Sequence, residues 1–165
     1  MLVFGASVST TQAGGISDQQ ADNLRAALLV SGIVAAGVKR DSQGLVQYSK
    51  SLIATAAATL VLKEVVDAER PNGEDNDSFP SGHVSMSAAS AAFLHKRYGW
   101  RYGLPAYLAT LLVAQNRLDN DHHRAVDVLA SLAIAVSINE KLTSTLLVTP
   151  KLSKSAIGIE LRLAY

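Results

Sequence analysis

The stretch that decides the fold reads Asn116-Arg117-Leu118-Asp119-Asn120-Asp121-His122-His123-Arg124-Ala125-Val126-Asp127 and leads into an apolar segment of helical length. Residues four apart share a helix face, so a helix here places the Asp127 carboxylate beside the His123 imidazole. A carboxylate that binds one ring nitrogen leaves the other with an exposed lone pair, as a nucleophile or a general base requires. The alternative is purely structural: the two histidines are ordinary polar residues at a helix start, and Asp127 is a buried acid whose hydrogen bonds are satisfied. This stretch alone leaves both interpretations open.

Composition predicts a single all-α domain with tight helix packing. The chain has 165 residues, of which 48% are hydrophobic and only 5% aromatic, and much of the apolar content is alanine at helical spacing. The formal net charge of +1 gives no electrostatic case for binding nucleic acid. The absence of cysteine excludes disulfides and thiolate metal sites.

Apolar periodicity predicts a bundle of about five core helices. Ser17 and Gln20 have the spacing of a capping box at the start of the first helix, and Pro71 ends the second. We expect the fourth helix to begin near Pro105, because proline fits a first helical turn. The expected helices cover residues 17–38, 45–69, 84–97 and 105–116, and a fifth that is capped by Asp119, Asn120 or Asp121 and continues through Leu142.

The helical domain is expected to span residues 17–148, between a flexible N-terminal segment (1–16) and a C-terminal tail (149–165). Apolar residues alternate in the tail with the period of a strand, but no partner strand is expected, so we predict a short strand or a packed or flexible tail. The longest uncharged apolar runs have about 12 to 14 residues, whereas a membrane span needs about 20. We therefore expect buried core helices, with at most peripheral membrane contact. The N-terminus shows no intact signal peptide.

Two further stretches supply groups that bind anions. Lys63 and Arg70 are seven residues apart, about two helical turns, so both can point the same way from the end of the second helix. Pro80-Ser81-Gly82-His83 lies directly before a helix start, where free N–H groups favour an anion and glycine allows close approach. Solvated cations and ordinary turn chemistry are the alternatives for each stretch alone. Together with Arg117 and His123, the set predicts a phosphate-sized anion site with one nucleophile and one acid.

These three stretches resemble the three-part signature of the type 2 phosphatidic acid phosphatases: Lys63-x6-Arg70-Pro71, Pro80-Ser81-Gly82-His83 and Asn116-Arg117-x5-His123-x3-Asp127. That family shares its α-helical fold and active-site pattern with bacterial class A acid phosphatases and vanadium haloperoxidases. The likeness covers residues 63–127, and three motifs in order with correct internal spacing make it specific.

The resemblance implies a phosphoric ester hydrolase and a role for each matching residue. His123 would attack phosphorus to form a phosphohistidine, with Asp127 holding its other ring nitrogen, and His83 would protonate the leaving oxygen. The groups that would bind the phosphoryl oxygens are Lys63, Arg70, Arg117, the Ser81 hydroxyl and the Gly82 amide. The family needs no metal or other cofactor, and vanadate or phosphate would bind as a mimic of the transition state or the product.

Two features depart from the family pattern. Asn116 stands where the family usually has serine, and because asparagine can still form hydrogen bonds, we expect altered support of Arg117 and no loss of activity. The loop between Pro71 and Pro80 is also short for the family. Its acids are expected to discourage highly charged substrates: Glu74, Asp75 and Asp77.

The resemblance favours hydrolysis of phosphate monoesters or lipid phosphates at the periplasmic face of a bacterial membrane. Two alternatives keep the fold. One is a catalytically idle anion-binding or membrane-associated module, and the other is a vanadate-dependent haloperoxidase in which His123 binds vanadium. The sequence leaves the natural substrate and the oligomeric state open.

Overall fold

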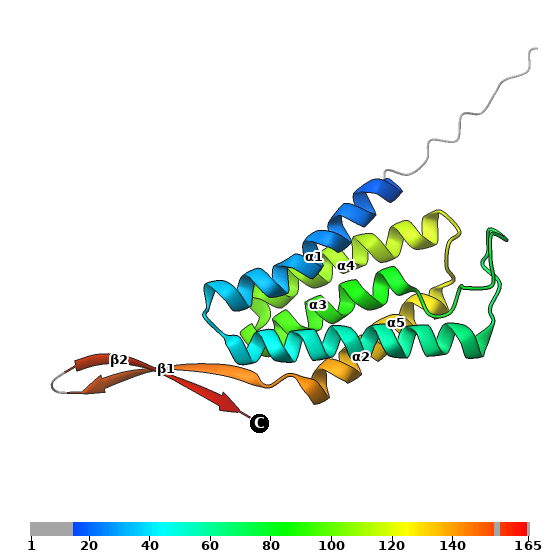
Figure 1. Ribbon diagram of the computed structural model, residues 1–165. Coiled ribbons are helices and arrows are strands. Elements are labelled where there is room, and N and C mark those ends of the chain that lie inside the picture. The colour runs from blue at the N-terminus through cyan, green and yellow to red at the C-terminus, as the bar shows by residue number, and fades with distance from the viewer. Residues whose placement is uncertain (1–14, 154–155, 165) are drawn as a thin grey trace, which may run out of the picture.

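The computed structural model describes residues 15–153 and 156–164. Within these residues the chain forms five helices and one β-hairpin (Figure 1). The elements are α1 (Asp18–Val38), α2 (Ser42–Val66), α3 (Gly82–Tyr98), α4 (Trp100–Asp119), α5 (Ala125–Leu142), β1 (Thr145–Ser153) and β2 (Ala156–Ala164). The predicted helical bundle is confirmed. Most of the predicted flexible N-terminal segment, residues 1–14, lies outside the described residues.

Helix α3 lies in the middle of the bundle and packs against α1, α2, α4 and α5. Its buried side chains are small where the neighbouring helices approach: Ser85, Ser87, Ala88, Ala89, Ser90, Ala91 and Ala92. Interaxial distances depend on the side chains at the contact, so this composition allows four helices to pack closely around one. Larger core side chains form a cluster with α1 and α2: Leu28, Tyr48, Phe93 and Leu94.

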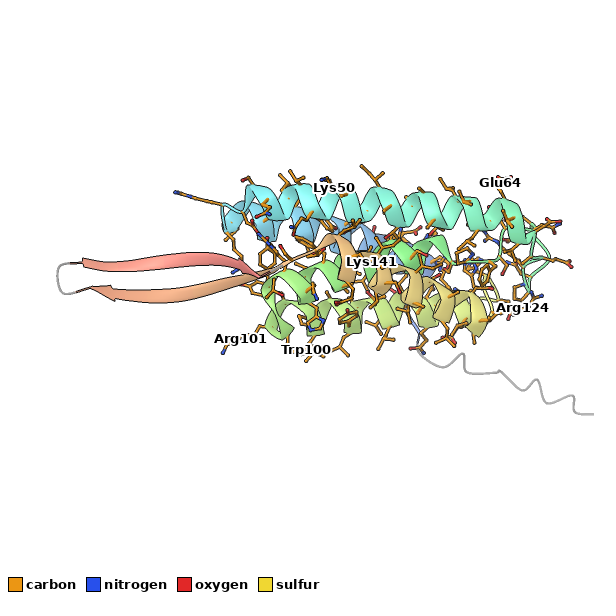
Figure 2. The ribbon with its side chains drawn as sticks, turned by 90° about the horizontal axis from the view of Figure 1, so that it is seen from below. Lys50, Glu64, Trp100, Arg101, Arg124 and Lys141 are labelled. Atoms are coloured by element: carbon orange, nitrogen blue, oxygen red, sulfur yellow. The ribbon has the colours of Figure 1, made fainter. Side chains whose placement is uncertain are left out.

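Successive helices run in opposite directions, which gives the bundle two chemically different ends (Figure 1). One end holds the N-termini of α1, α3 and α5 and the C-termini of α2 and α4, together with the connecting segments 67–81 and 120–124. Glu64 and Arg124 lie at this end, whereas Trp100 and Arg101 lie at the other (Figure 2). The hairpin extends away from the bundle on the side opposite segment 67–81 (Figure 1).

Helix α1 begins as predicted. Ser17 is its N-cap: the Gln20 amide N–H donates to the Ser17 hydroxyl at 3.3 Å, and the Ser17 N–H donates to Gln20 Oε1 at 2.8 Å. These two reciprocal bonds satisfy backbone donors that the first helical turn leaves without a partner.

The predicted start of the fourth helix at Pro105 is wrong, because α4 begins at Trp100 and contains Pro105 in its interior. Gly99, with φ of 86°, ends α3 and starts α4 with no intervening loop. The two helices cross closely there, since a Cβ added at Gly103 would lie 2.4 Å from the Cβ of His95. The proline therefore does not mark the first turn.

The predicted cap of the fifth helix is also wrong. Helix α5 begins at Ala125, and its N-cap is Arg124, whose N–H donates to Asp127 Oδ2 at 2.8 Å. Asp119 is instead the last residue of α4, and Asn120 is its C-cap. His123 therefore precedes the helix, and a shared helical face is not what brings it close to Asp127.

The tail contains more regular structure than expected. The alternation predicted a strand near the C-terminus, and β2 is found there, but its antiparallel partner β1 was not anticipated. The register pairs Thr145 with Ala164 and Ser153 with Ala156. The boundary predicted after residue 148 consequently falls inside β1.

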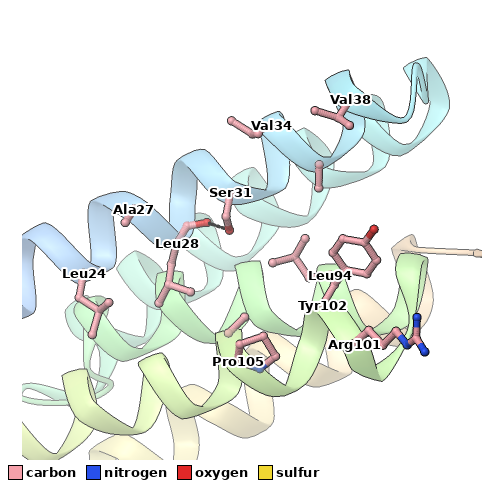
Figure 3. Close-up of a pocket in the computed structure, with 12 residues that line it drawn as sticks. Leu24, Ala27, Leu28, Ser31, Val34, Val38, Leu94, Arg101, Tyr102 and Pro105 are labelled. Atoms are coloured by element: carbon pink, nitrogen blue, oxygen red, sulfur yellow. Dashed lines mark hydrogen bonds between the residues drawn. The ribbon is translucent and has the colours of Figure 1, made fainter.

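The prediction that the apolar runs form buried core helices is wrong for the first two helices. Both α1 and α2 are long and apolar enough to cross a membrane, with mean hydropathy of 1.4 and 1.3, and only 22% of each apolar window is buried. Counting uncharged apolar runs missed them because single charged residues, Arg25 in α1 and Lys50 and Lys63 in α2, divide each helix into shorter runs. An apolar groove of about 500 Å³ also opens between α1 and α4, with Leu28, Leu94 and Pro105 among its lining residues (Figure 3).

Candidate active site

All eight residues predicted to form the anion site lie at one end of the bundle. Lys63 is in the last turn of α2, Arg70 is in the segment that follows, and Arg117 is in the last turn of α4. The remaining five lie at or just before the starts of α3 and α5: Ser81, Gly82, His83, His123 and Asp127. Backbone hydrogen bonds join these segments, from the His123 N–H to the Arg117 carbonyl at 3.1 Å and from the Ser81 N–H to the Asp127 carbonyl at 3.4 Å.

His123 is held by a backbone carbonyl. Its ring Nδ1 lies 2.8 Å from the Ser78 carbonyl oxygen and 3.8 Å from Asp127 Oδ2. The expectation that Asp127 holds this ring nitrogen directly is therefore wrong, because the carbonyl occupies that position. A carbonyl can only accept, so Nδ1 carries the proton and the neutral ring keeps its lone pair on Nε2.

The electrostatic surroundings keep His123 neutral. Only 4% of the residue is exposed. Burial lowers the pKa of His123 to about 4, and the positive charges of Arg70 and Lys63 act in the same direction, against the Ser78 carbonyl and Asp127. At neutral pH the ring therefore has the unprotonated Nε2 that nucleophilic attack requires.

Asp127 acts on His123 through Ser78. Its Oδ2 accepts the Ser78 hydroxyl at 2.6 Å and the Arg124 N–H at 2.8 Å, and the residue is almost fully buried. The carboxylate thus fixes the segment whose carbonyl orients the imidazole. Sequence reasoning missed Ser78, because one serine in a polar loop carries no spacing signal.

Each of the three cations contacts a carboxylate at this end of the bundle. Arg70 Nε lies 2.6 Å from Asp75 Oδ1, and Lys63 Nζ lies 3.7 Å from Asp77 Oδ2 and also donates to the Asp77 carbonyl. Arg117 Nη2 donates to Asp18 Oδ1 at 2.8 Å. The loop acids Asp75 and Asp77, predicted to discourage highly charged substrates, therefore pair directly with phosphate-binding candidates.

Asn116 does support Arg117. Its Oδ1 accepts from Arg117 Nε at 2.8 Å and from Nη2, while its Nδ2 donates to the Ile16 carbonyl at 2.8 Å. Burial lowers the pKa of Arg117, and the charges of Arg25 and Arg70 act in the same direction. Asparagine in place of the expected serine is therefore no reason to expect an idle site.

The start of α3 presents backbone donors and the Ser81 hydroxyl. Ser81 is buried, and its hydroxyl caps the helix by accepting from the Val84 N–H at 3.5 Å. Accepting this bond leaves the hydroxyl hydrogen able to donate, so the predicted role of Ser81 as a phosphate donor stays a prediction. Beside Gly82, a Cβ would meet nothing within 4 Å, so the first turn is open to a ligand there.

Helix α1 supplies two acids that sequence reasoning missed. Asp22 Oδ1 lies 2.8 Å from His83 Nε2, and Asp18 contacts Arg117 and also Asn120, at 2.9 Å. An acid in the first helical turn, such as Asp18, is expected from the helix dipole alone, and Asp22 lies one turn further on, so neither position gave a separate signal. The site as a whole combines cations, backbone donors, a neutral imidazole with an unprotonated Nε2 and a second imidazole, and this set of groups is suited to phosphoryl transfer.

Comparison with known proteins agrees with this arrangement. The family model described as PAP2 superfamily matches residues 44–140, more than half of the chain. The chain belongs to the PAP2 superfamily. The match covers nearly all of α2 and the whole of α3 and α4, but it leaves out α1 and its two acids.

The PAP2 match is accompanied by similarity to lipid A phosphatases. A lipid A 1-phosphatase of Porphyromonas gingivalis is 29% identical over 56% of this chain and 23% of its own length. A lipid A 1-phosphatase of Helicobacter pylori is 32% identical over 60% of the chain and 56% of its own length. A lipid A 4'-phosphatase of Helicobacter pylori is 27% identical over 73% of the chain and 66% of its own length. The chain thus spans from about a quarter to just under two thirds of these relatives. No solved structure matches it significantly.

Proposed function

We propose that the protein is a metal-independent phosphatase that hydrolyses lipid phosphate monoesters through a phosphohistidine on His123. The observation that carries the proposal is the orientation of this imidazole: the Ser78 carbonyl binds Nδ1, so the lone pair is on Nε2. The charges of Lys63 and Arg70 are close enough to act on the same ring. The proposed nucleophile, His123, therefore lies close to two of the cations, Lys63 and Arg70, that would bind the phosphoryl group.

In the first step, Nε2 of His123 attacks phosphorus while the bond from phosphorus to the leaving oxygen breaks, and His83 gives that oxygen a proton. In the second step, water attacks the phosphohistidine, His83 takes the water proton, and the phosphorus–nitrogen bond breaks to release phosphate. Lys63, Arg70 and Arg117 would bind the phosphoryl oxygens and supply the positive charge that a metal ion provides in other phosphatases.

Lipid phosphates are the proposed substrate class because the bundle has an apolar exterior. The three relatives described above are named for lipid A, and α1 and α2 each meet the length and hydropathy of a membrane span. Large apolar side chains are exposed on both helices and on α4, among them Val34, Ile53, Val61, Leu108 and Leu112. We infer that α1 and α2 cross the membrane with the site near one surface.

The distribution of charge supports an outward-facing site. Exposed acids are frequent at the site end of the described chain: Asp67, Glu69, Glu74, Asp119 and Asp121. At the other end, Lys39, Arg40 and Arg101 lie near Trp100 and Tyr102. Cytoplasmic loops are enriched in lysine and arginine, and tryptophan and tyrosine favour membrane interfaces. These features support the proposal that the opposite end faces the cytoplasm and the site faces the periplasm.

Two substitutions test the chemistry. His123→Ala and His83→Ala should each lower phosphate release from a lipid phosphate in mixed micelles to the rate without enzyme, or close to it. His95→Ala is the matched control, because His95 stacks on Trp100 with ring centroids 4.0 Å apart and makes none of the site contacts described above. Quenching the wild type in alkaline detergent after mixing with ³²P-labelled substrate should trap a phosphoprotein that is stable to alkali, labile to acid and missing in His123→Ala. Wild-type rates in both site variants would refute the proposal.

A further inference from the structure

Asp22, on the first helix and outside the matched part of the chain, contacts the second imidazole of the site. Its Oδ1 lies 2.8 Å from His83 Nε2. We propose that Asp22 is the positioning residue of His83, holding Nε2–H so that Nδ1 faces the leaving oxygen and favouring the protonated ring that the acid role needs. This rests on the proposed phosphatase function.

The geometry shows that the Asp22 carboxylate is directed at the imidazole. The same Oδ1 is 4.0 Å from Arg25, which is 3 residues further along the helix, compared with 2.8 Å from His83. Asp22 has 47% of its side chain exposed, so it retains solvent contact while its contacting oxygen faces the site. A histidine with a carboxylate on one nitrogen is fixed in tautomer and orientation, which leaves the other nitrogen for the reaction.

The start of α1 is anchored to the site by contacts of residues that precede Asp22. Arg117 and Asn120 both donate to Asp18 Oδ1, one helical turn before Asp22, and Asn116 donates to the Ile16 carbonyl. Asp18 and Asp22 are four residues apart and therefore share a helix face. Contacts with Arg117 thus fix the position from which Asp22 reaches His83.

The charges around His83 make Asp22 necessary for acid catalysis. The charged groups that face His83 are Asp22 and Arg25 from α1 and Arg117 from α4. Burial lowers the pKa of His83, and both arginines act in the same direction, whereas Asp22 opposes them. Without Asp22, only cations would face the ring, so its pKa would fall further and less of the protonated form would be available to donate to the leaving oxygen.

Replacing Asp22 by asparagine tests the proposal in the full-length chain. Asp22→Asn keeps the shape and an acceptor oxygen but removes the charge. Asp119→Asn is the matched control, because it removes one negative charge from the same end of the bundle at an exposed residue. The substrates are an alkyl phosphate, whose leaving oxygen needs a proton, and a nitrophenyl phosphate, whose leaving oxygen does not.

The expected result is a selective loss. Each unit by which the His83 pKa falls reduces the protonated fraction about tenfold at higher pH, so Asp22→Asn should lower kcat for the alkyl phosphate about tenfold or more. We expect less than a threefold change for the nitrophenyl ester, and a shift of the alkaline limb of the alkyl rate to lower pH. Asp119→Asn should show neither effect. An equal loss on both esters, or an unshifted alkaline limb, would overturn the proposal.

A second measurement does not depend on turnover. NMR titration of histidine-labelled protein, with the His83 signal assigned by its absence in His83→Ala, should show a lower His83 pKa in Asp22→Asn than in the wild type or in Asp119→Asn. An unchanged titration would refute the proposed contact. If the wild type released no phosphate from any ester, the phosphatase proposal would fail, and the titration alone would decide whether Asp22 governs His83.

Discussion

Replacing Ser78 by alanine would test whether the loop serine connects the buried acid to the nucleophile. The change removes the hydroxyl that donates to Asp127 Oδ2 at 2.6 Å but keeps the carbonyl that accepts from His123 Nδ1. A hydrogen bond to a charged group contributes about 1.5 to 3 kcal/mol to stability. About 1.4 kcal/mol corresponds to a tenfold change in rate. If the whole free energy of this hydrogen bond is lost from the transition state, kcat/KM should fall about 10- to 150-fold.

The assay is the initial rate of phosphate release from a lipid phosphate in mixed micelles, with thermal unfolding followed in parallel. Ser87→Ala is the matched control, because Ser87 is also buried but its hydroxyl has no hydrogen-bond partner among the described residues. It should keep kcat/KM within about twofold of the wild type, since no paired group loses its partner. Equal rates in Ser78→Ala and Ser87→Ala would refute the connection through Ser78.

Four further outcomes follow from the surroundings of His123, Arg97 and Asn116. Because the pKa of His123 is about 4, the acid limb of kcat/KM, corrected for substrate ionisation, should lie near pH 4, and an inflection near 6.5 would contradict the burial argument. The unfolded histidine binds its proton near pH 6.5, so His123 should also cost stability as pH falls from about 6.5 to 4, measurable by denaturant titration. Arg97→Met leaves the Asp41 carboxylate without its two 2.8 Å bonds and should cost about 3 to 5 kcal/mol in unfolding free energy; a loss below 1 kcal/mol would argue against a buried ion pair. Asn116→Ala should lower kcat/KM about 10- to 100-fold by removing an acceptor of Arg117, whereas Asn116→Ser should retain more activity, and equal rates would contradict that support.

Local patterns in the sequence were enough to predict the helical bundle and to select candidate residues that lie at one end of it. Capping chemistry at Ser17 and Gln20 depends only on neighbours in sequence, so it could be predicted correctly. The start of α4 could not, because a single glycine, Gly99, reverses the chain and Pro105 is accommodated inside a helix.

The other contacts that could not be predicted join segments that are distant in the sequence. Ser78 meets Asp127 across 49 positions, and Asp22 meets His83 across 61. Nothing in the local sequence around Ser78 or Asp22 distinguishes it from an ordinary loop serine or an acid near a helix start. Only the packing of α1 and segment 67–81 against the other helix ends brings these groups to the imidazoles.

The pairing of Lys63, Arg70 and Arg117 with Asp77, Asp75 and Asp18 means that the protein supplies counter-ions to its own cations. A phosphoryl group would enter by exchanging with carboxylates, so its affinity reflects the difference between two sets of ion pairs. After the proposed hydrolysis, the same carboxylates would compete with inorganic phosphate for the cations, which would favour departure of the product and limit occupation of the site by anions from the medium.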